Sequence, residues 1–98
     1  MDCQVTLAPL ALADLEEIVR YVARDDPAAA GRLGQRLLDA AETLCRLPRR
    51  GSSVRQRPGV KKLLVQPCLI FYRFDEPTRR VEILRCWHGA RDQSQLRL

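Results

Sequence analysis

The chain has 98 residues, a length that allows one folded domain and leaves no room for a second. Its hydrophobic content of 46%, charged content of 30% and net charge of +5 are typical of a globular protein and exclude extended disorder. No stretch approaches the roughly eighteen apolar residues of a membrane span, and the first residues do not resemble a secretory signal, so we expect one cytoplasmic domain over residues 1–98 without membrane contact.

The first third of the sequence predicts a strand followed by a helix. Residues 2–7 alternate polar side chains with apolar or small ones, a pattern typical of a strand. Leu15, Ile18 and Val22 then recur at helical spacing, which predicts an amphipathic helix over about residues 9–24. This helix has one apolar face to bury.

A second amphipathic helix follows directly. Asp26 is a suitable N-cap and Pro27 suits the first helical position, whereas Pro48 and Gly51 end the helix. Because the connection between the two helices is so short, they must form an antiparallel hairpin. The predicted apolar stripe contains Ala30, Leu33, Leu37, Ala40 or Ala41, Leu44 and Leu47.

Beyond residue 50 the pattern changes to short strands separated by turns. Residues 62–66, 68–74 and 80–87 are rich in β-forming side chains, and residues 52–56 add a possible short strand. Proline, glycine and aspartate at the turns predict antiparallel neighbours. The order of elements predicts an α+β fold, in which the helical hairpin packs on one face of a small, mainly antiparallel sheet.

One predicted strand is apolar on both faces. Residues 68–72 read Cys-Leu-Ile-Phe-Tyr, without the alternation of a strand that has one solvated face. Either the tail or the loops of the protein cover the second face, or that face binds a partner.

Positive charge is concentrated in the second half of the chain. Residues 1–48 hold five basic and eight acidic side chains, a net charge of −3, and residues 49–98 hold twelve basic and four acidic ones, a net charge of +8. The segment from residue 49 to residue 62 contains no acidic side chain. Such a segment is typical of a surface that binds an anionic partner, or of a solvated loop. Its cations, the predicted target-binding or nucleic-acid-binding residues, are Arg49, Arg50, Arg55, Arg57, Lys61 and Lys62.

The four cysteines are widely scattered, at positions 3, 45, 68 and 86. They form no Cys-x-x-Cys pair and have only one histidine near them, a spacing that does not fit a zinc site. We expect no metal and no other cofactor. Four cysteines could form two disulfides, but Cys45, Cys68 and Cys86 lie in apolar stretches, which favours reduced core residues.

The order and spacing of several motifs resemble the RelE/ParE toxin superfamily. The resemblance covers roughly residues 3–92. The segments that carry it are Ala11-x-x-Asp14-Leu15-x-x-Ile18-x-x-Tyr21, Pro27-x-x-Ala30, Leu44-x-x-x-Pro48-x-x-Gly51, Pro58–Leu63, Ile70–Arg73 and Leu84–Asp92.

The resemblance implies a toxin of a type II toxin–antitoxin module, of the kind that stabilises plasmids and inhibits growth. It implies a β-α-α-β-β-β fold, with one further strand optional, and a protein antitoxin that binds the toxin in a hetero-oligomer. In this superfamily the ParE branch inhibits DNA gyrase by binding it, and the RelE branch cleaves mRNA on the ribosome. A shared fold does not distinguish these activities.

Ribonuclease chemistry needs an acid or base and cations around the phosphate. The candidate catalytic residues are His88, as acid or base, with Arg73 and Arg91, and Arg85 is a further cation for phosphate or target binding. The alternative for His88 is a hydrogen-bonding role at the end of a strand.

Two positions depart from the ribonuclease branch that the sequence resembles. Leu69 stands where that branch has an arginine, and Gly89 stands where it has a tyrosine. Losing one preorganised donor alone costs about 2.7–4 kcal/mol of transition-state stabilisation. The sequence therefore favours a gyrase inhibitor without a catalytic site, with the ribonuclease as the alternative and a member that has lost its toxicity as a third reading.

Overall fold

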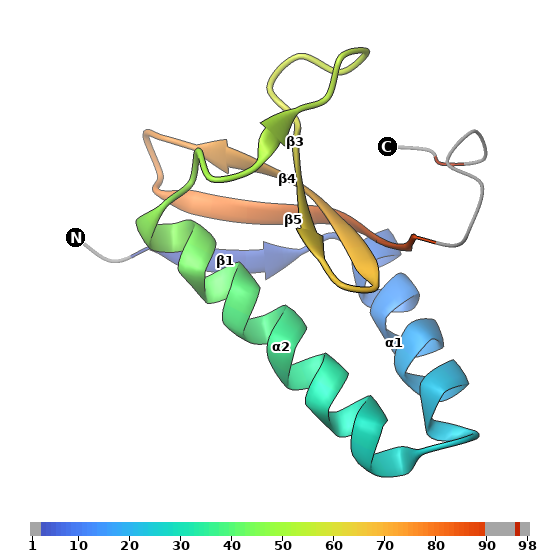
Figure 1. Ribbon diagram of the computed structural model, residues 1–98. Coiled ribbons are helices and arrows are strands. Elements are labelled where there is room, and N and C mark those ends of the chain that lie inside the picture. Colours follow the sequence, from blue (N-terminus) through green and yellow to red (C-terminus); the bar gives the residue numbers. More distant parts are fainter. Residues whose placement is uncertain (1–2, 90–95, 97–98) are drawn as a thin grey trace.

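A computed structural model describes residues 3–89 and residue 96. Two helices lie on one side of a five-stranded sheet (Figure 1). This arrangement confirms the predicted α+β fold, and only the strand predicted at 52–56 is much shorter than expected. The elements are β1 (Gln4–Leu7), α1 (Pro9–Ala23), α2 (Pro27–Arg46), β2 (Ser52–Ser53), β3 (Lys61–Val65), β4 (Cys68–Asp75) and β5 (Arg80–His88).

Neither helix in the described part of the chain has the length and apolar character that would let it cross a membrane.

The sheet has the strand order β1-β5-β4-β3-β2. All neighbours are antiparallel, as predicted for β3, β4 and β5, except that β1 runs parallel to β5. The pairing of β1 stops at Leu7, opposite Ile83, and the Ala8 N–H donates to the Ile83 carbonyl at 2.9 Å. The chain then turns into α1. The last part of β5, Leu84–His88, therefore extends beyond β1, although β4 still pairs with it on the other side.

The main core lies between the helices and the sheet. The predicted stripe of α2 is confirmed, because its apolar residues are buried, although Leu47 at its end is 58% exposed. A buried aliphatic side chain of this kind stabilises the fold by about 1.5–3 kcal/mol. The buried residues of this core include Ala11, Ile18, Leu33, Leu37, Ala41, Leu44, Ile70, Tyr72, Val81 and Ile83.

A smaller apolar cluster covers the open face of the sheet, which is the face away from the helices. Val60, Phe71 and Trp87 are buried there, and Val54 and Leu96 pack against them. Because neighbours of Phe71 and Trp87 along β4 and β5 point into the main core, these strands are apolar on both faces. Val54 and Val60 of the loop and Leu96 of the tail therefore cover the apolar part of the second face of β4, as the first of the two predicted alternatives requires.

The expectation of a reduced cysteine is wrong for Cys45. Cys3 and Cys45 form a disulfide, with their Cα atoms 5.6 Å apart. The reason is tertiary: β1 packs beside α2, and this brings together residues that are 42 positions apart in the sequence. Cys68 and Cys86 are free and buried, as predicted. Burial, followed by the nearby Asp14 carboxylate, raises the pKa of Cys86 to about 12, so this thiol stays protonated and unreactive at neutral pH.

Candidate functional site

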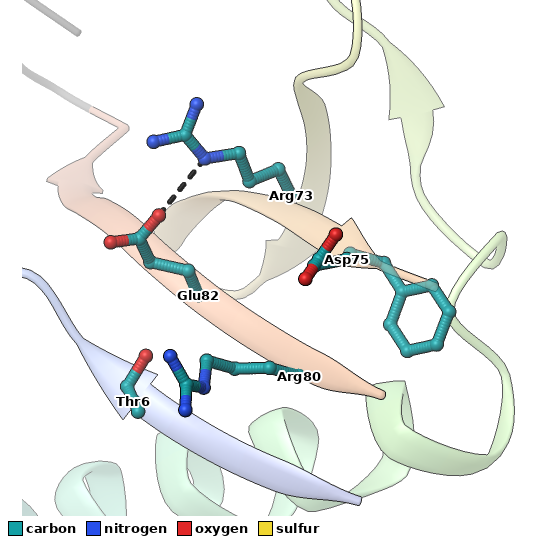
Figure 2. A pocket seen from close by; sticks show the side chains of 6 residues that line it. Thr6, Arg73, Asp75, Arg80 and Glu82 are labelled. Carbon is teal, nitrogen blue, oxygen red and sulfur yellow. Dashed lines mark hydrogen bonds and ion pairs between the residues drawn. The ribbon is translucent and has the colours of Figure 1, made fainter. Parts of the chain in front are cut away.

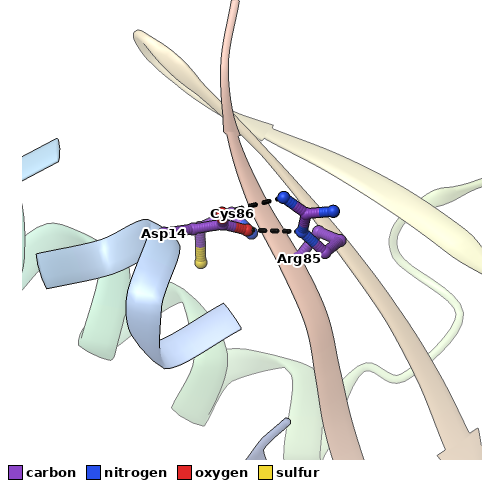
Figure 3. A network of polar contacts seen from close by, with 3 residues as sticks. All are labelled: Asp14, Arg85 and Cys86. Atoms are coloured by element: carbon purple, nitrogen blue, oxygen red, sulfur yellow. Dashed lines mark hydrogen bonds and ion pairs between the residues drawn. The ribbon is translucent and has the colours of Figure 1, made fainter. Parts of the chain in front are cut away.

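A buried ion pair joins α1 to β5. Asp14 accepts hydrogen bonds from Arg85 Nε at 2.6 Å and from an Arg85 terminal nitrogen at 2.9 Å, so the contact is bidentate (Figure 3). The backbone N–H of Cys86 donates to the same carboxylate at 3.1 Å. The exposed fractions of the Asp14 and Arg85 side chains are 8% and 12%. The pair is therefore well shielded from water, and its charges are mutually satisfied.

The Asp14 carboxylate accepts a backbone hydrogen bond from β5 at a point where β5 has no neighbouring strand on that side. β1 pairs with β5 only as far as Ile83, and the Cys86 N–H lies beyond that point. An unpaired backbone N–H in such a buried position would cost about 1–3 kcal/mol. Asp14 supplies the missing acceptor from the helix. This explains why a helix that is otherwise apolar on this face carries an acid between Ala11 and Ile18.

The structure gives Arg85 a structural role. The sequence predicted it as a target-binding cation, but its guanidinium is held by Asp14 and lies over the Trp87 ring, 5.3 Å from the ring centroid. The hydrogen bonds to Asp14 raise the pKa of Arg85 still further. A buried guanidinium that is already neutralised in this way has little capacity left to bind an outside phosphate.

Arg73 lies in a polar hollow of about 390 Å³ on the open face (Figure 2). Its Nε donates to Glu82 at 2.9 Å, and Arg80 reaches across β1 toward Thr6. Asp75 completes the charged lining. Two cations and two anions share this hollow, so it has no excess positive charge with which to bind a phosphate.

His88 lies in a different hollow, of about 420 Å³, between the end of β5 and α1. It stands opposite Cys68 in the sheet register, whereas Arg73 stands opposite Glu82. The two candidate catalytic residues are thus five positions apart along β4, about 17 Å, and they face opposite sides of the sheet. The structure does not bring Arg73 and His88 together, and Arg91 lies outside the described residues.

The cations between Arg49 and Lys62 remain accessible. The four arginines are exposed and the two lysines are partly exposed. In the described part of the chain, none of them takes part in an ion pair. They occupy the α2–β3 connection and the start of β3, at the end of the sheet where β2 pairs with β3. This basic segment, Arg49–Lys62, is the main positive surface that the structure leaves unneutralised.

Sequence reasoning missed the role of Asp14. A signal existed, because an acid at the i+3 position between two buried residues of a helix requires a buried partner. The partner itself lies 71 positions away and is not apparent from the sequence. Across residues 3–89, the structure shows no cluster of three or more His, Cys, Asp or Glu side chains suited to a metal ion.

The comparisons with known proteins agree with this fold. The family described as "ParE toxin of type II toxin-antitoxin system, parDE" matches residues 5–93. Toxin RelE2 of Caulobacter vibrioides is 35% identical over 88 residues, which cover 90% of this chain and 97% of that protein. A chain of the chromosomal ParDE system from P. aeruginosa superposes with a TM-score of 0.71 at 23% identity, covering 88% of this chain and 95% of that one.

A second solved structure, the RelBE2 toxin–antitoxin complex from Mycobacterium tuberculosis, gives a TM-score of 0.64 at 24% identity and covers 90% of this chain and 99% of that one. Both structures show that the fold is that of the superfamily. The sequence matches go further than the fold. This chain belongs to the ParE toxin family of type II toxin–antitoxin systems, within the RelE/ParE superfamily.

Proposed function

We propose that this toxin inhibits DNA gyrase by binding it, with the basic segment in contact with the target. The observation that carries the proposal is the match to the ParE toxin family over residues 5–93. The unneutralised cations of the basic segment support it, because such a surface steers and holds an anionic partner. The cytoplasm is then the compartment in which the toxin acts.

The geometry of the candidate catalytic residues also supports binding over cleavage. General acid–base catalysis needs groups within hydrogen-bond reach of one substrate. Arg73 is paired with Glu82, Arg85 is paired with Asp14, and His88 lies on the other side of the sheet from Arg73. These three residues do not surround a common phosphate.

A cognate antitoxin belongs to the same proposal. The similar solved structures from P. aeruginosa and M. tuberculosis come from toxin–antitoxin systems. In this chain, both helices present large exposed apolar side chains, which are Leu10, Leu12 and Tyr21 on α1 and Leu38 on α2. Apolar side chains of this kind are suited to a partner helix or an extended segment of an antitoxin.

A supercoiling assay tests the proposed target. We expect the purified chain to inhibit DNA gyrase at micromolar concentration, and the cognate antitoxin to reverse the inhibition. The double variant Arg55→Ala with Arg57→Ala should weaken inhibition, because it removes two exposed cations of the basic segment. Arg20→Ala with Arg24→Ala removes the same charge from the last turn of α1 and its C-cap, and serves as the control. Absence of inhibition by the unmodified chain would exclude gyrase as the target.

The alternative activity is a ribosome-dependent ribonuclease, which is suggested by the 35% identity with Toxin RelE2. His88→Ala separates the two activities. We expect growth inhibition to persist in this variant, because a binding inhibitor needs no acid or base. Growth would be measured after induced expression, with Arg73→Ala as a parallel variant and antitoxin binding as the check on folding. Loss of toxicity together with intact antitoxin binding would favour the ribonuclease.

A further inference from the structure

The hydroxyl of Tyr72 holds a turn at the start of the basic segment. Tyr72 is fully buried in β4, and its Oη donates to the Pro48 carbonyl at 2.8 Å. The same oxygen accepts the Gly51 N–H at 2.9 Å. Arg49 and Arg50 are the two residues between these anchored groups. Burial raises the pKa of Tyr72, so the hydroxyl keeps the proton that it donates to Pro48.

The turn itself is tightly packed. The Arg50 N–H donates to the Leu47 carbonyl at 3.0 Å, which closes a turn directly after α2. Gly51 has no room for a side chain, since a Cβ there would lie 2.6 Å from the Lys62 carbonyl oxygen and 2.8 Å from the Tyr72 hydroxyl. The backbone is thus fixed on both sides of Arg49 and Arg50, whereas both of these side chains are exposed.

We propose that Tyr72 is a positioning residue for a phosphate-binding turn, in which Arg49 and Arg50 bind the backbone of a nucleic acid. This inference rests on the proposed function and deepens it, because gyrase acts on DNA, and it assigns Arg49 and Arg50 to the DNA of the gyrase–DNA complex rather than to the enzyme itself. The guanidinium fork matches phosphate oxygens in a bidentate manner. Ser52 and Ser53, which follow the turn and are exposed, carry hydroxyls of the kind that donate to phosphates.

The composition of the surface favours phosphate over an acidic protein. Protein interfaces are centred on apolar or aromatic anchors. Leu47, at the start of the turn, and Leu64, in β3, are exposed apolar side chains, but none occurs between Pro48 and Lys62, where Val54 packs into the cluster on the open face. A surface whose middle consists of exposed arginines and serines, with exposed leucines only at its ends, is typical of contact with a nucleic-acid backbone.

The next two arginines provide an internal comparison. Arg55 and Arg57 belong to a loop that is closed by its own backbone, with the Val54 N–H donating to the Val60 carbonyl at 3.0 Å and the Val60 N–H donating to the Arg57 carbonyl at 3.1 Å. The hydrogen bonds of the Tyr72 hydroxyl go to Pro48 and Gly51, and not to the loop that contains these two arginines. Removing that hydroxyl should therefore disturb Arg49 and Arg50 and leave Arg55 and Arg57 in place.

The experiment measures binding of the full chain to a short fluorescein-labelled DNA duplex over a range of salt concentrations. We expect Tyr72→Phe to weaken binding by about 2- to 10-fold, since the arginines must then be ordered on binding. Tyr21→Phe, which changes a tyrosine that is 64% exposed on α1, should have no effect. Arg49→Ala with Arg50→Ala should reduce the salt dependence of binding, because fewer counterions are released.

A double-mutant cycle separates positioning from a general loss of stability. Tyr72→Phe should cost little affinity once Arg49 and Arg50 are alanine, but its full cost should persist when Arg55 and Arg57 are alanine. Equal costs in both backgrounds would overturn the positioning role, and so would failure of the unmodified chain to bind the duplex. If Tyr72→Phe does not fold, the affinities of the two double variants for the duplex are compared instead. An equal loss of affinity from Arg49→Ala with Arg50→Ala and from Arg55→Ala with Arg57→Ala would refute the proposal. The gyrase assay is independent of this duplex, so a negative result there would leave the duplex measurement interpretable.

Discussion

Replacing Asp14 with alanine is expected to lower the free energy of unfolding by about 3–5 kcal/mol, the cost of leaving one member of a buried ion pair without its partner. Arg85 would lose both of its bonds to the carboxylate, and the Cys86 N–H would lose its acceptor. Urea denaturation followed by the fluorescence of Trp87, the single tryptophan, provides the measurement.

Three further variants make this prediction specific. Asp14→Asn keeps an acceptor for the Cys86 N–H but removes the charge, so its loss should be smaller. Asp14→Ala combined with Arg85→Met should recover part of the stability, because the unpaired buried charge is removed. Glu17→Ala changes an exposed acid on the same helix and should stay within about 0.5 kcal/mol of the unmodified chain. A loss below about 1 kcal/mol for Asp14→Ala would show that water reaches the pair.

The substitution Gly51→Ala is expected to destabilise the fold by about 2–4 kcal/mol, from overpacking together with loss of a hydrogen bond. The new Cβ would lie 2.6 Å from the Lys62 carbonyl oxygen, which belongs to the backbone of a paired strand and cannot easily move. Pushing the turn away would break the bond between the Gly51 N–H and the Tyr72 hydroxyl.

Gly31→Ala is the matched control for Gly51→Ala. Gly31 lies within α2, is exposed, and has no atom within 4 Å of the position of an added Cβ. Alanine has the higher helix propensity, so this variant should gain up to about 1 kcal/mol. Thermal unfolding of both variants would measure the difference, and a Gly51→Ala chain as stable as Gly31→Ala would contradict the packing described for the turn.

The helices and strands could be predicted from the sequence, because the spacing of apolar residues that identifies each one lies within that helix or strand. The stripe of α2 and the N-cap at Asp26, which accepts the Ala29 N–H at 3.1 Å, depend only on neighbours in the sequence. The same holds for the strands around the turns at 66–67 and 76–79. The strand at 52–56 was predicted too long because its pairing requires β3, which extends only from Lys61 to Val65.

The functional assignment of single cations was less predictable, because it depends on distant partners. Arg73 and Arg85 both lie within apolar strands, yet partly exposed Glu82 pairs with the first and buried Asp14 pairs with the second, from a helix 71 positions away. The disulfide between Cys3 and Cys45 likewise requires that β1 pack beside α2. The net charge of a segment follows from composition, but the part of that charge available to a target follows from tertiary pairing.

The parallel contact between β1 and β5 has a consequence for synthesis on the ribosome. β1 is the first strand of the chain to be made, and its sole strand partner, β5, is the last strand in the described residues. The buried bond from Asp14 to Arg85 likewise waits for β5. The helical hairpin can form early, but the sheet closes only after β5 has been made. The part of the core between α1 and β5 therefore stays open to solvent until the last strand of the described residues has been made.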